Sequence, residues 1–323
     1  MEKTLKYSVV VPLCNEQGNV LILDEQIKQT MNEISDSYSP SSRSHSYEII
    51  YVNDGSKDKT LEELKKLKKI KIINLNRNYG QATALDAGFK QSKGEIVISL
   101  DGDLQNDPKD IPRLLEKLKK EDLDVVCGWR KHRKDKNGIR ILTRIGRVLR
   151  RFLIKDPVHD TGCTLRVYKK NAVKSLDLQG EMHRYILSLL RWKGFTIGEI
   201  EVNHRPRYRG KTKYGYIKAI RGFIDLINVW FLQKYSQRPA HMFGSLGLLS
   251  FFFGLGITIW SILRKILNKV DLSENGWFIV GLFFMGISIF LFSMGFLLNM
   301  LIRIKFDVSK FEKRYYIRNI INK

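Results

Sequence analysis

The chain has 323 residues and a formal net charge of +23 at pH 7, with three cysteines and six histidines. Its length suits one α/β domain of ordinary size and a smaller additional part. Three widely spaced cysteines exclude a disulfide framework, and neither they nor the histidines show the spacing of a zinc site. Nucleic acid is one partner for a basic chain, but the sequence contains no recognition motif for it, and we expect no nucleic-acid partner.

Strand and helix signals alternate over roughly the first 130 residues. Strands are expected at Tyr7–Pro12, Tyr47–Asn53, Lys71–Leu75, Glu95–Leu100 and Val125–Gly128. Helices are expected between them at Asn19–Ile34, Thr60–Lys68, Gly80–Gln91 and Pro112–Lys120. This alternation predicts a largely parallel sheet with helices on both faces. In such folds, ligands bind at the carboxyl ends of the strands.

Two carboxylates, Asp101 and Asp103, directly follow the fourth expected strand. At a strand end both can converge on a divalent cation, and their hard oxygen atoms suit Mg²⁺ or Mn²⁺ with positions left for diphosphate oxygens. Asp, Gly, Asn and Pro are also turn formers, so this motif alone could be only a turn. Three further polar loops belong to the same pattern, namely Val11–Glu16, Val52–Asp58 and Asn76–Gly80. Four such loops on one edge of the sheet predict a pocket for a nucleoside and a metal.

Two basic amphipathic segments follow this region. Residues 129–151 combine many Arg and Lys residues with apolar residues at near-helical spacing, which is typical of a helix on a membrane surface or near an anionic ligand. A solvated charged face is the alternative for most of these cations. Residues 216–240 carry a similar pattern, which predicts one or two interfacial helices.

The carboxyl-terminal part contains two long apolar runs. Residues 242–263 and 276–302 comprise about 22 and about 27 residues without a charge, and each is long enough to cross a ~30 Å hydrocarbon core. We therefore expect a catalytic domain at 1–215, interfacial helices at 216–240, two transmembrane helices at 241–303 and a basic cytoplasmic tail at 304–323. The excess of Lys and Arg before and after the spans predicts that the catalytic domain and the C-terminus are cytoplasmic. It also favours binding to an anionic membrane surface.

Together these residues resemble the family 2 glycosyltransferases with a GT-A fold. Asp-Gly-Asp-Leu-Gln-x-Asp-Pro at 101–108, Gly-Lys-Thr-Lys-Tyr at 210–214 and the two spans are similar to polyprenyl-phosphate glycosyltransferases. That group contains dolichol-phosphate mannose synthases and bactoprenol glucosyltransferases. The resemblance covers nearly the whole chain, and it implies an α/β, Rossmann-like GT-A domain with interfacial amphipathic helices and a two-helix transmembrane hairpin.

The resemblance also implies roles for individual residues. The nucleotide-binding residues would be Pro12, Glu16, Asp54, Asp101 and Lys213. The Mg²⁺ or Mn²⁺ ion would be held by Asp103 and Gln105. The acceptor phosphate would be bound by Arg130, Arg140, Thr143 and Arg207. The candidate catalytic residues are Asp101, Asp103, Asp160 and Glu181. Asp160 would contact the sugar or orient an arginine, with a turn or helix cap as the alternative, and Glu181 would bind sugar hydroxyls.

The implied reaction is inverting transfer of a hexose from a nucleotide sugar, UDP-glucose or UDP-GlcNAc, to an undecaprenyl or dolichyl phosphate. Because this acceptor is already an anion at pH 7, the site needs positioned cations more than a general base. A processive polysaccharide synthase is one alternative, although Ser188 stands where the Gln of its Gln-x-x-Arg-Trp motif is expected. A non-catalytic membrane scaffold is another. The sequence leaves the sugar open, and a homo-oligomer is one option for the oligomeric state.

Overall fold

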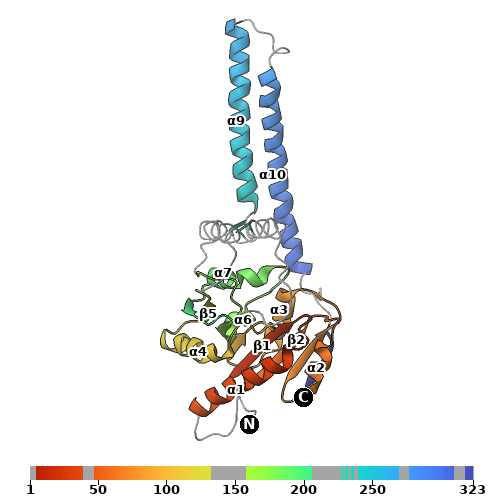
Figure 1. Cartoon of the computed structure of the whole chain (residues 1–323). Helices are drawn as coiled ribbons and strands as arrows, with labels where there is room; N and C mark the ends of the chain where they lie inside the picture. Colours follow the sequence, from red (N-terminus) through yellow and green to blue (C-terminus); the bar gives the residue numbers. More distant parts are fainter. Residues whose placement is uncertain are drawn as a thin grey trace. The chain divides into compact units, whose positions relative to one another are not determined.

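The computed structural model describes residues 5–38, 47–131, 158–205, 239–268, 276–308 and 317–322, and a few single positions between 227 and 235. The chain divides into two compact units. The first contains residues 1–229 and 314–323, and the second contains residues 230–313. A β-sheet covered by helices forms the first unit, and two long helices form most of the second (Figure 1).

The sheet of the first unit has eight strands in the order β7-β5-β6-β4-β1-β2-β3-β8. Their bounds are β1 (Tyr7–Leu13), β2 (Tyr47–Asn53), β3 (Lys71–Leu75), β4 (Ile96–Ser99), β5 (Val125–Trp129), β6 (Arg166–Lys169), β7 (Ile197–Glu201) and β8 (Ile317–Asn322). The central strands β4, β1, β2 and β3 are parallel. β6 and β8 run antiparallel to their neighbours, so the sheet is mixed. The five strands predicted from the sequence are all present.

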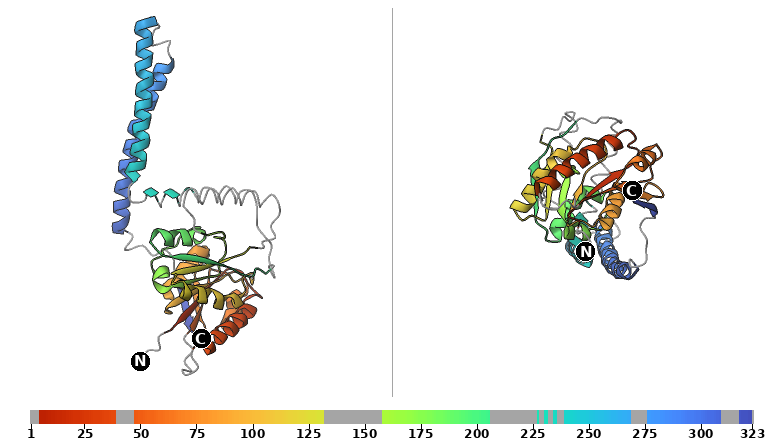
Figure 2. Two further views of the ribbon diagram at one scale, coloured as in Figure 1. Left: turned by 90° about the vertical axis from the view of Figure 1, so that its left-hand side faces the viewer. Right: turned by 90° about the horizontal axis from the view of Figure 1, so that it is seen from below.

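Helices cover both faces of this sheet (Figure 2). Their bounds are α1 (Val20–Tyr38), α2 (Thr60–Lys66), α3 (Gln81–Gln91), α4 (Ile111–Lys120), α6 (Lys170–Lys174) and α7 (Ile186–Trp192), with short 3₁₀ helices η1 (Pro108–Asp110) and η2 (Met182–Tyr185). Successive strand side chains point to opposite faces. Val9 therefore packs in one core with α1, α2 and α4, while Val10 packs in a second core with α3, α6 and α7. Burial on both faces explains why β1 is apolar nearly throughout.

The last strand, β8, differs from the expectation of a separate basic tail. Residues 317–322 pair antiparallel with β3 and complete one edge of the sheet. The sequence Ile-Arg-Asn-Ile-Ile-Asn is short and lies within a strongly basic stretch. The surrounding Lys and Arg residues led to the prediction of a charged tail, and the short strand was not recognised. The residues after the second long helix thus contribute to the first unit.

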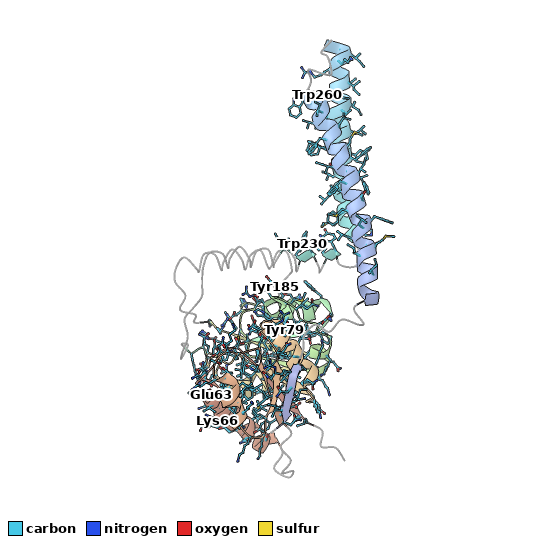
Figure 3. The ribbon with its side chains drawn as sticks, turned by 90° about the vertical axis from the view of Figure 1, so that its right-hand side faces the viewer. Glu63, Lys66, Tyr79, Tyr185, Trp230 and Trp260 are labelled. Carbon is cyan, nitrogen blue, oxygen red and sulfur yellow. The ribbon has the colours of Figure 1, made fainter. Side chains whose placement is uncertain are left out.

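The second unit contains α9 (Pro239–Asn268) and α10 (Gly276–Val308), which include both predicted spans. Ala240–Leu267 and Gly276–Leu301 have mean hydropathies of 2.0 and 2.2 and are mostly exposed. The two helices pack closely. The Ser250 hydroxyl on α9 donates a hydrogen bond to the Phe284 carbonyl on α10 at 2.7 Å. Trp260, labelled in Figure 3, packs edge to face with Trp277 near the ends of the helices that face the connecting segment. Apolar exposed faces, close packing and terminal aromatics suit a membrane-spanning hairpin.

Candidate active site

A pocket of about 230 Å³ opens at the carboxyl ends of β1, β2 and β4. Among the described residues, it is lined by Pro12, Leu13, Cys14, Glu16, Asp54, Asn78, Gly80, Gln81, Ala84, Asp101, Gly102 and Asp103. Neighbouring parallel strands end at the same edge of a sheet, and this topology brings together polar loops that are far apart in the sequence. The pocket thus unites the predicted nucleotide residues Pro12, Glu16, Asp54 and Asp101 with the predicted metal ligand Asp103.

Asp54 forms one wall of the pocket and fixes the start of α3. One of its carboxylate oxygens accepts the Tyr79 backbone N–H at 2.7 Å, and the other accepts that of Gly80 at 2.9 Å. Burial raises the pKa of the Asp54 carboxyl above its usual range, although these two hydrogen bonds act in the opposite direction. Carboxylates at helix N-termini are favourable because they satisfy free N–H groups. Asp54 therefore holds the loop before α3 in place.

The adjacent Gly55 is needed for the close approach of two loops. Its φ is +60°, and a Cβ atom there would lie 2.3 Å from the carbonyl carbon of Arg77 and 2.4 Å from the nitrogen of Asn78. Both neighbours are backbone atoms, which cannot move aside without displacing the loop. A side chain at this position would therefore open the pocket wall.

We expect Gly55→Ala to lower both stability and nucleotide affinity. The matched control is Gly180→Ala, since Gly180 has φ +52° and, among the described residues, no neighbour within 4 Å of the place that a Cβ atom would take. The control should lose only the ~1–2 kcal/mol of a left-handed residue, whereas Gly55→Ala should lose a further ~1–3 kcal/mol from overpacking. Thermal unfolding and UDP binding would test this, and equal effects of the two substitutions would contradict it.

Glu16 is positioned by a second pair of loops, in which residues 15–18 hydrogen-bond to residues 56–63. The backbone N–H of Glu16 donates to the Thr60 hydroxyl at 2.9 Å, and that of Gly18 donates to the Glu63 carboxylate at 2.9 and 3.1 Å. The Glu16 carboxylate accepts from the Asn19 amide at 2.7 Å. Two strand-end loops thus form one rigid rim of the pocket.

Asp101 and Asp103 line the same pocket after the end of β4. Gln81 donates from its side-chain amide to Asp101 at 2.7 Å. Burial, and then the negative charge of Asp103, raise the pKa of Asp101 to about 6. Asp103 is 7% exposed, and its carboxylate accepts the Gln105 backbone N–H at 3.2 Å. A buried and a half-buried carboxylate that repel each other are a favourable environment for a divalent cation.

The donor set available to a cation at this position is a carboxylate pair. Within the described part of the chain, no three His, Cys, Asp or Glu side chains gather as a metal-binding group. A pair fits Mg²⁺, which is commonly held by one or two carboxylates together with substrate phosphates and water. Gln105 lies outside the set of pocket-lining residues, and its contact with Asp103 is made by its backbone.

Arg130 and Asp160 form a bidentate ion pair. The guanidinium Nε donates to Asp160 Oδ2 at 2.7 Å and Nη2 donates to Oδ1 at 3.0 Å. The same carboxylate also accepts the Gly162 backbone N–H at 3.0 Å. The two side chains are only 13% and 10% exposed. Of the interpretations considered for Asp160, this geometry matches the orientation of an arginine, because both of its oxygens face Arg130, and the hydrogen bond from Gly162 also matches the turn alternative.

Among the described residues, one further predicted site residue is Glu181. Glu181 forms a half-exposed ion pair with Arg184 at 3.0 Å and does not line the pocket. Arg140, Thr143, Arg207 and Lys213 lie outside the described residues.

The structure adds residues that the sequence reasoning did not single out. Gln81 lines the pocket beside Asn78, which belongs to the predicted Asn76–Gly80 loop. Gln81 reaches Asp101 from 20 positions earlier in the chain, and no local pattern signals such a contact. Arg166 is buried and donates to the carbonyls of Cys163 and Thr161 at 2.8 and 2.7 Å. It thereby fixes the loop that contains Asp160.

A helix-covered mixed sheet with a carboxylate-lined pocket at the carboxyl ends of its parallel strands is the architecture of the GT-A glycosyltransferases. The family model for glycosyl transferase family 2 matches residues 8–177, and the chain belongs to this family. It is therefore a glycosyltransferase, and the prediction of an enzyme of this family is confirmed.

Two curated relatives match along almost their whole length. Dodecaprenyl-phosphate galacturonate synthase of Rhizobium johnstonii is 35% identical over 338 residues, which cover 99% of this chain and 94% of the relative. Undecaprenyl-phosphate 4-deoxy-4-formamido-L-arabinose transferase of Edwardsiella ictaluri is 33% identical over 326 residues, covering 99% and 95%.

Solved structures confirm the fold. Glucosyl-3-phosphoglycerate synthase from Mycobacterium tuberculosis, crystallised with Mn²⁺, UDP and phosphoglyceric acid, superposes with a TM-score of 0.52 at 18% identity. The match covers 71% of this chain and 78% of that one.

Proposed function

We propose that this chain transfers a sugar from a nucleoside diphosphate sugar to a polyprenyl phosphate. The observation that carries the proposal is the match over 99% of the chain to two enzymes whose names specify polyprenyl-phosphate acceptors. That match includes the apolar helices α9 and α10, which suit an enzyme with a lipid substrate. The carboxylate-lined pocket supplies a site of suitable chemistry for the donor.

In the proposed reaction, an oxygen of the lipid phosphate attacks the anomeric carbon from the face opposite the diphosphate. The bond between that carbon and the diphosphate oxygen breaks, its electron pair leaves with the nucleoside diphosphate, and the anomeric configuration inverts. No proton has to be removed from the acceptor. A divalent cation held by Asp101 and Asp103 would offset the negative charge that develops on the leaving group.

The residues of the chain have separate tasks in this proposal. Asp54 keeps the loop before α3 in position beside the nucleotide. Gln81 holds Asp101 in a fixed orientation. Asp160 holds the guanidinium of Arg130, which would attract the acceptor phosphate against the charge of the donor.

The relatives alter the expectation for the donor. The sequence analysis expected UDP-glucose or UDP-GlcNAc, whereas the relatives are named for galacturonate and for 4-deoxy-4-formamido-L-arabinose. We therefore put the UDP-linked forms of these two sugars first. The proposal places α9 and α10 across the membrane and the first unit in the cytoplasm, as the positive-inside tendency predicts.

The test is transfer of radiolabel from a panel of UDP sugars into butanol-extractable lipid. The full-length protein would be assayed with undecaprenyl phosphate and Mn²⁺ or Mg²⁺, with EDTA as one control and omission of the lipid as the other. We expect label from one donor, lost in both controls. Label that accumulates in a polymer would indicate a processive synthase, and no label from any donor with a folded protein would refute the proposal.

A further inference from the structure

The chain's last strand, β8, reaches the nucleotide pocket through a row of hydrogen-bonded amides. We propose that Asn319 of β8 is a positioning residue for nucleotide binding, acting through Asn74 and Asn53 on the loop that carries Asp54. The inference rests on the proposed function, since it assigns the pocket to a nucleotide. It makes the segment after the second apolar helix a working part of the donor site.

The register of β8 is set by its pairs with β3 and shifts at an irregularity between Asn74 and Leu75. Asn319 lies opposite Asn74 in the antiparallel pair, and Ile321 lies opposite Ile72. The side chain of Ile321 packs against one core of the sheet, and that of Ile317 packs against the other. A shift by one residue would move these side chains to the wrong faces. Asn319 is thus held at one position beside β3.

Three asparagines form a continuous row across β2, β3 and β8. Asn74 donates from Nδ2 to Asn319 Oδ1 at 3.1 Å, and Asn53 donates from Nδ2 to Asn74 Oδ1 at 2.8 Å. Asn53 and Asn74 are only 2% and 4% exposed. Asn319 is exposed, whereas a buried amide without partners is costly, so the contact with Asn319 constrains Asn74 and Asn74 in turn constrains Asn53.

The row ends at both loops of the pocket rim. The Asn53 side-chain oxygen accepts the Ser56 backbone N–H at 3.4 Å, and the Ser56 hydroxyl accepts the Asn15 backbone N–H at 3.0 Å. Asp54 and Glu16, which line the pocket, are the immediate neighbours of Asn53 and Asn15. The row therefore connects β8 with the two loops that we expect to surround the nucleoside.

The consequence of losing Asn319 follows from these contacts. Without an acceptor, the Asn74 amide group would be left without its partner on β8, and a rotated Asn74 would present a donor where Asn53 needs an acceptor. The strain would pass to residues 53–56 after β2, whereas Asp101 and Asp103 follow a different strand, β4. Nucleotide binding should therefore weaken while the chemical step is preserved.

The experiment compares three variants of the full-length protein in lipid nanodiscs. Asn319→Ala removes the acceptor, Asn319→Asp retains a carboxylate oxygen in its place, and Asn322→Ala changes the far end of the same strand, opposite Lys71. We expect Asn319→Ala to raise the Kd for UDP and the donor KM about three- to tenfold with kcat changed by less than about twofold. Asn319→Asp and Asn322→Ala should bind UDP as the wild type does.

A second readout is amide hydrogen exchange of the wild type and Asn319→Ala. Residues 53–60 should exchange faster in the variant, while α4 should not change. A lower melting temperature with unchanged UDP affinity would reduce Asn319 to a structural residue and overturn the inference. If the wild type itself bound no UDP, the proposed function would fail and this inference with it. Wild-type binding with an identical Asn319→Ala would overturn the inference alone.

Discussion

Asp103→Asn is expected to lower the transfer rate by about 10³-fold or more, because it removes one of two carboxylates that would hold the divalent cation. Cation stabilisation of a leaving diphosphate is worth several kcal/mol, and each 1.4 kcal/mol is about tenfold in rate. Asparagine preserves the size of the side chain and can still accept the Gln105 N–H. The loss would therefore reflect charge, and the fold should persist.

The measurement is the rate of label transfer at several Mn²⁺ concentrations, with thermal unfolding in parallel. Asp122→Asn is the matched control, since this carboxylate is 95% exposed and pairs with Lys169 on the surface. The control should keep the wild-type rate, and EDTA should reduce the wild type to the level of Asp103→Asn. An Asp103→Asn protein with more than about a tenth of the wild-type rate and unaltered Mn²⁺ dependence would remove Asp103 from the metal site.

The parts of this site that were predictable from the sequence are those set by local pattern. Strand β4 is a mostly apolar run that ends at Ser99, two residues before Asp101, and strand β2 ends at Asn53 beside Asp54. Parallel topology then places such strand ends together without further information. The first five strands, β1 to β5, and the polar loops at the pocket were predictable in this way, whereas β6, β7 and β8 were not.

Contacts between distant segments were not predictable in the same way. The link from Gln81 to Asp101 crosses 20 positions, and the link from Asn74 to Asn319 crosses 245. Neither contact involves a sequence motif. Asparagine and glutamine are common surface residues, and nothing in the sequence identifies their distant hydrogen-bond partners. Strand β8 was missed for a related reason. Its short pattern predicts a strand only when the unpaired edge of β3, to which it binds, is already known.

The second large effect on activity is expected when the ion pair of Arg130 with Asp160 is broken. If Asp160 acts by orienting Arg130, then Arg130→Ala and Asp160→Ala should each lower kcat/KM for the lipid phosphate by about 10²-fold, corresponding to roughly 3 kcal/mol for a buried charge-assisted contact. The double variant should be little worse than either single variant, because the second substitution removes a partner whose task is already lost.

A direct contact between Asp160 and the sugar makes a different prediction. The effects of the two substitutions would then multiply, and Asp160→Ala would change the KM for the donor more than that for the acceptor. Stability must be followed alongside, because removing one member of a buried pair leaves an uncompensated charge and destabilises by about 3 to 5 kcal/mol. The double variant should recover part of this stability, while its kcat/KM for the lipid phosphate stays as low as that of the single variants. A simple folding defect would not give this result, because activity would then recover together with stability.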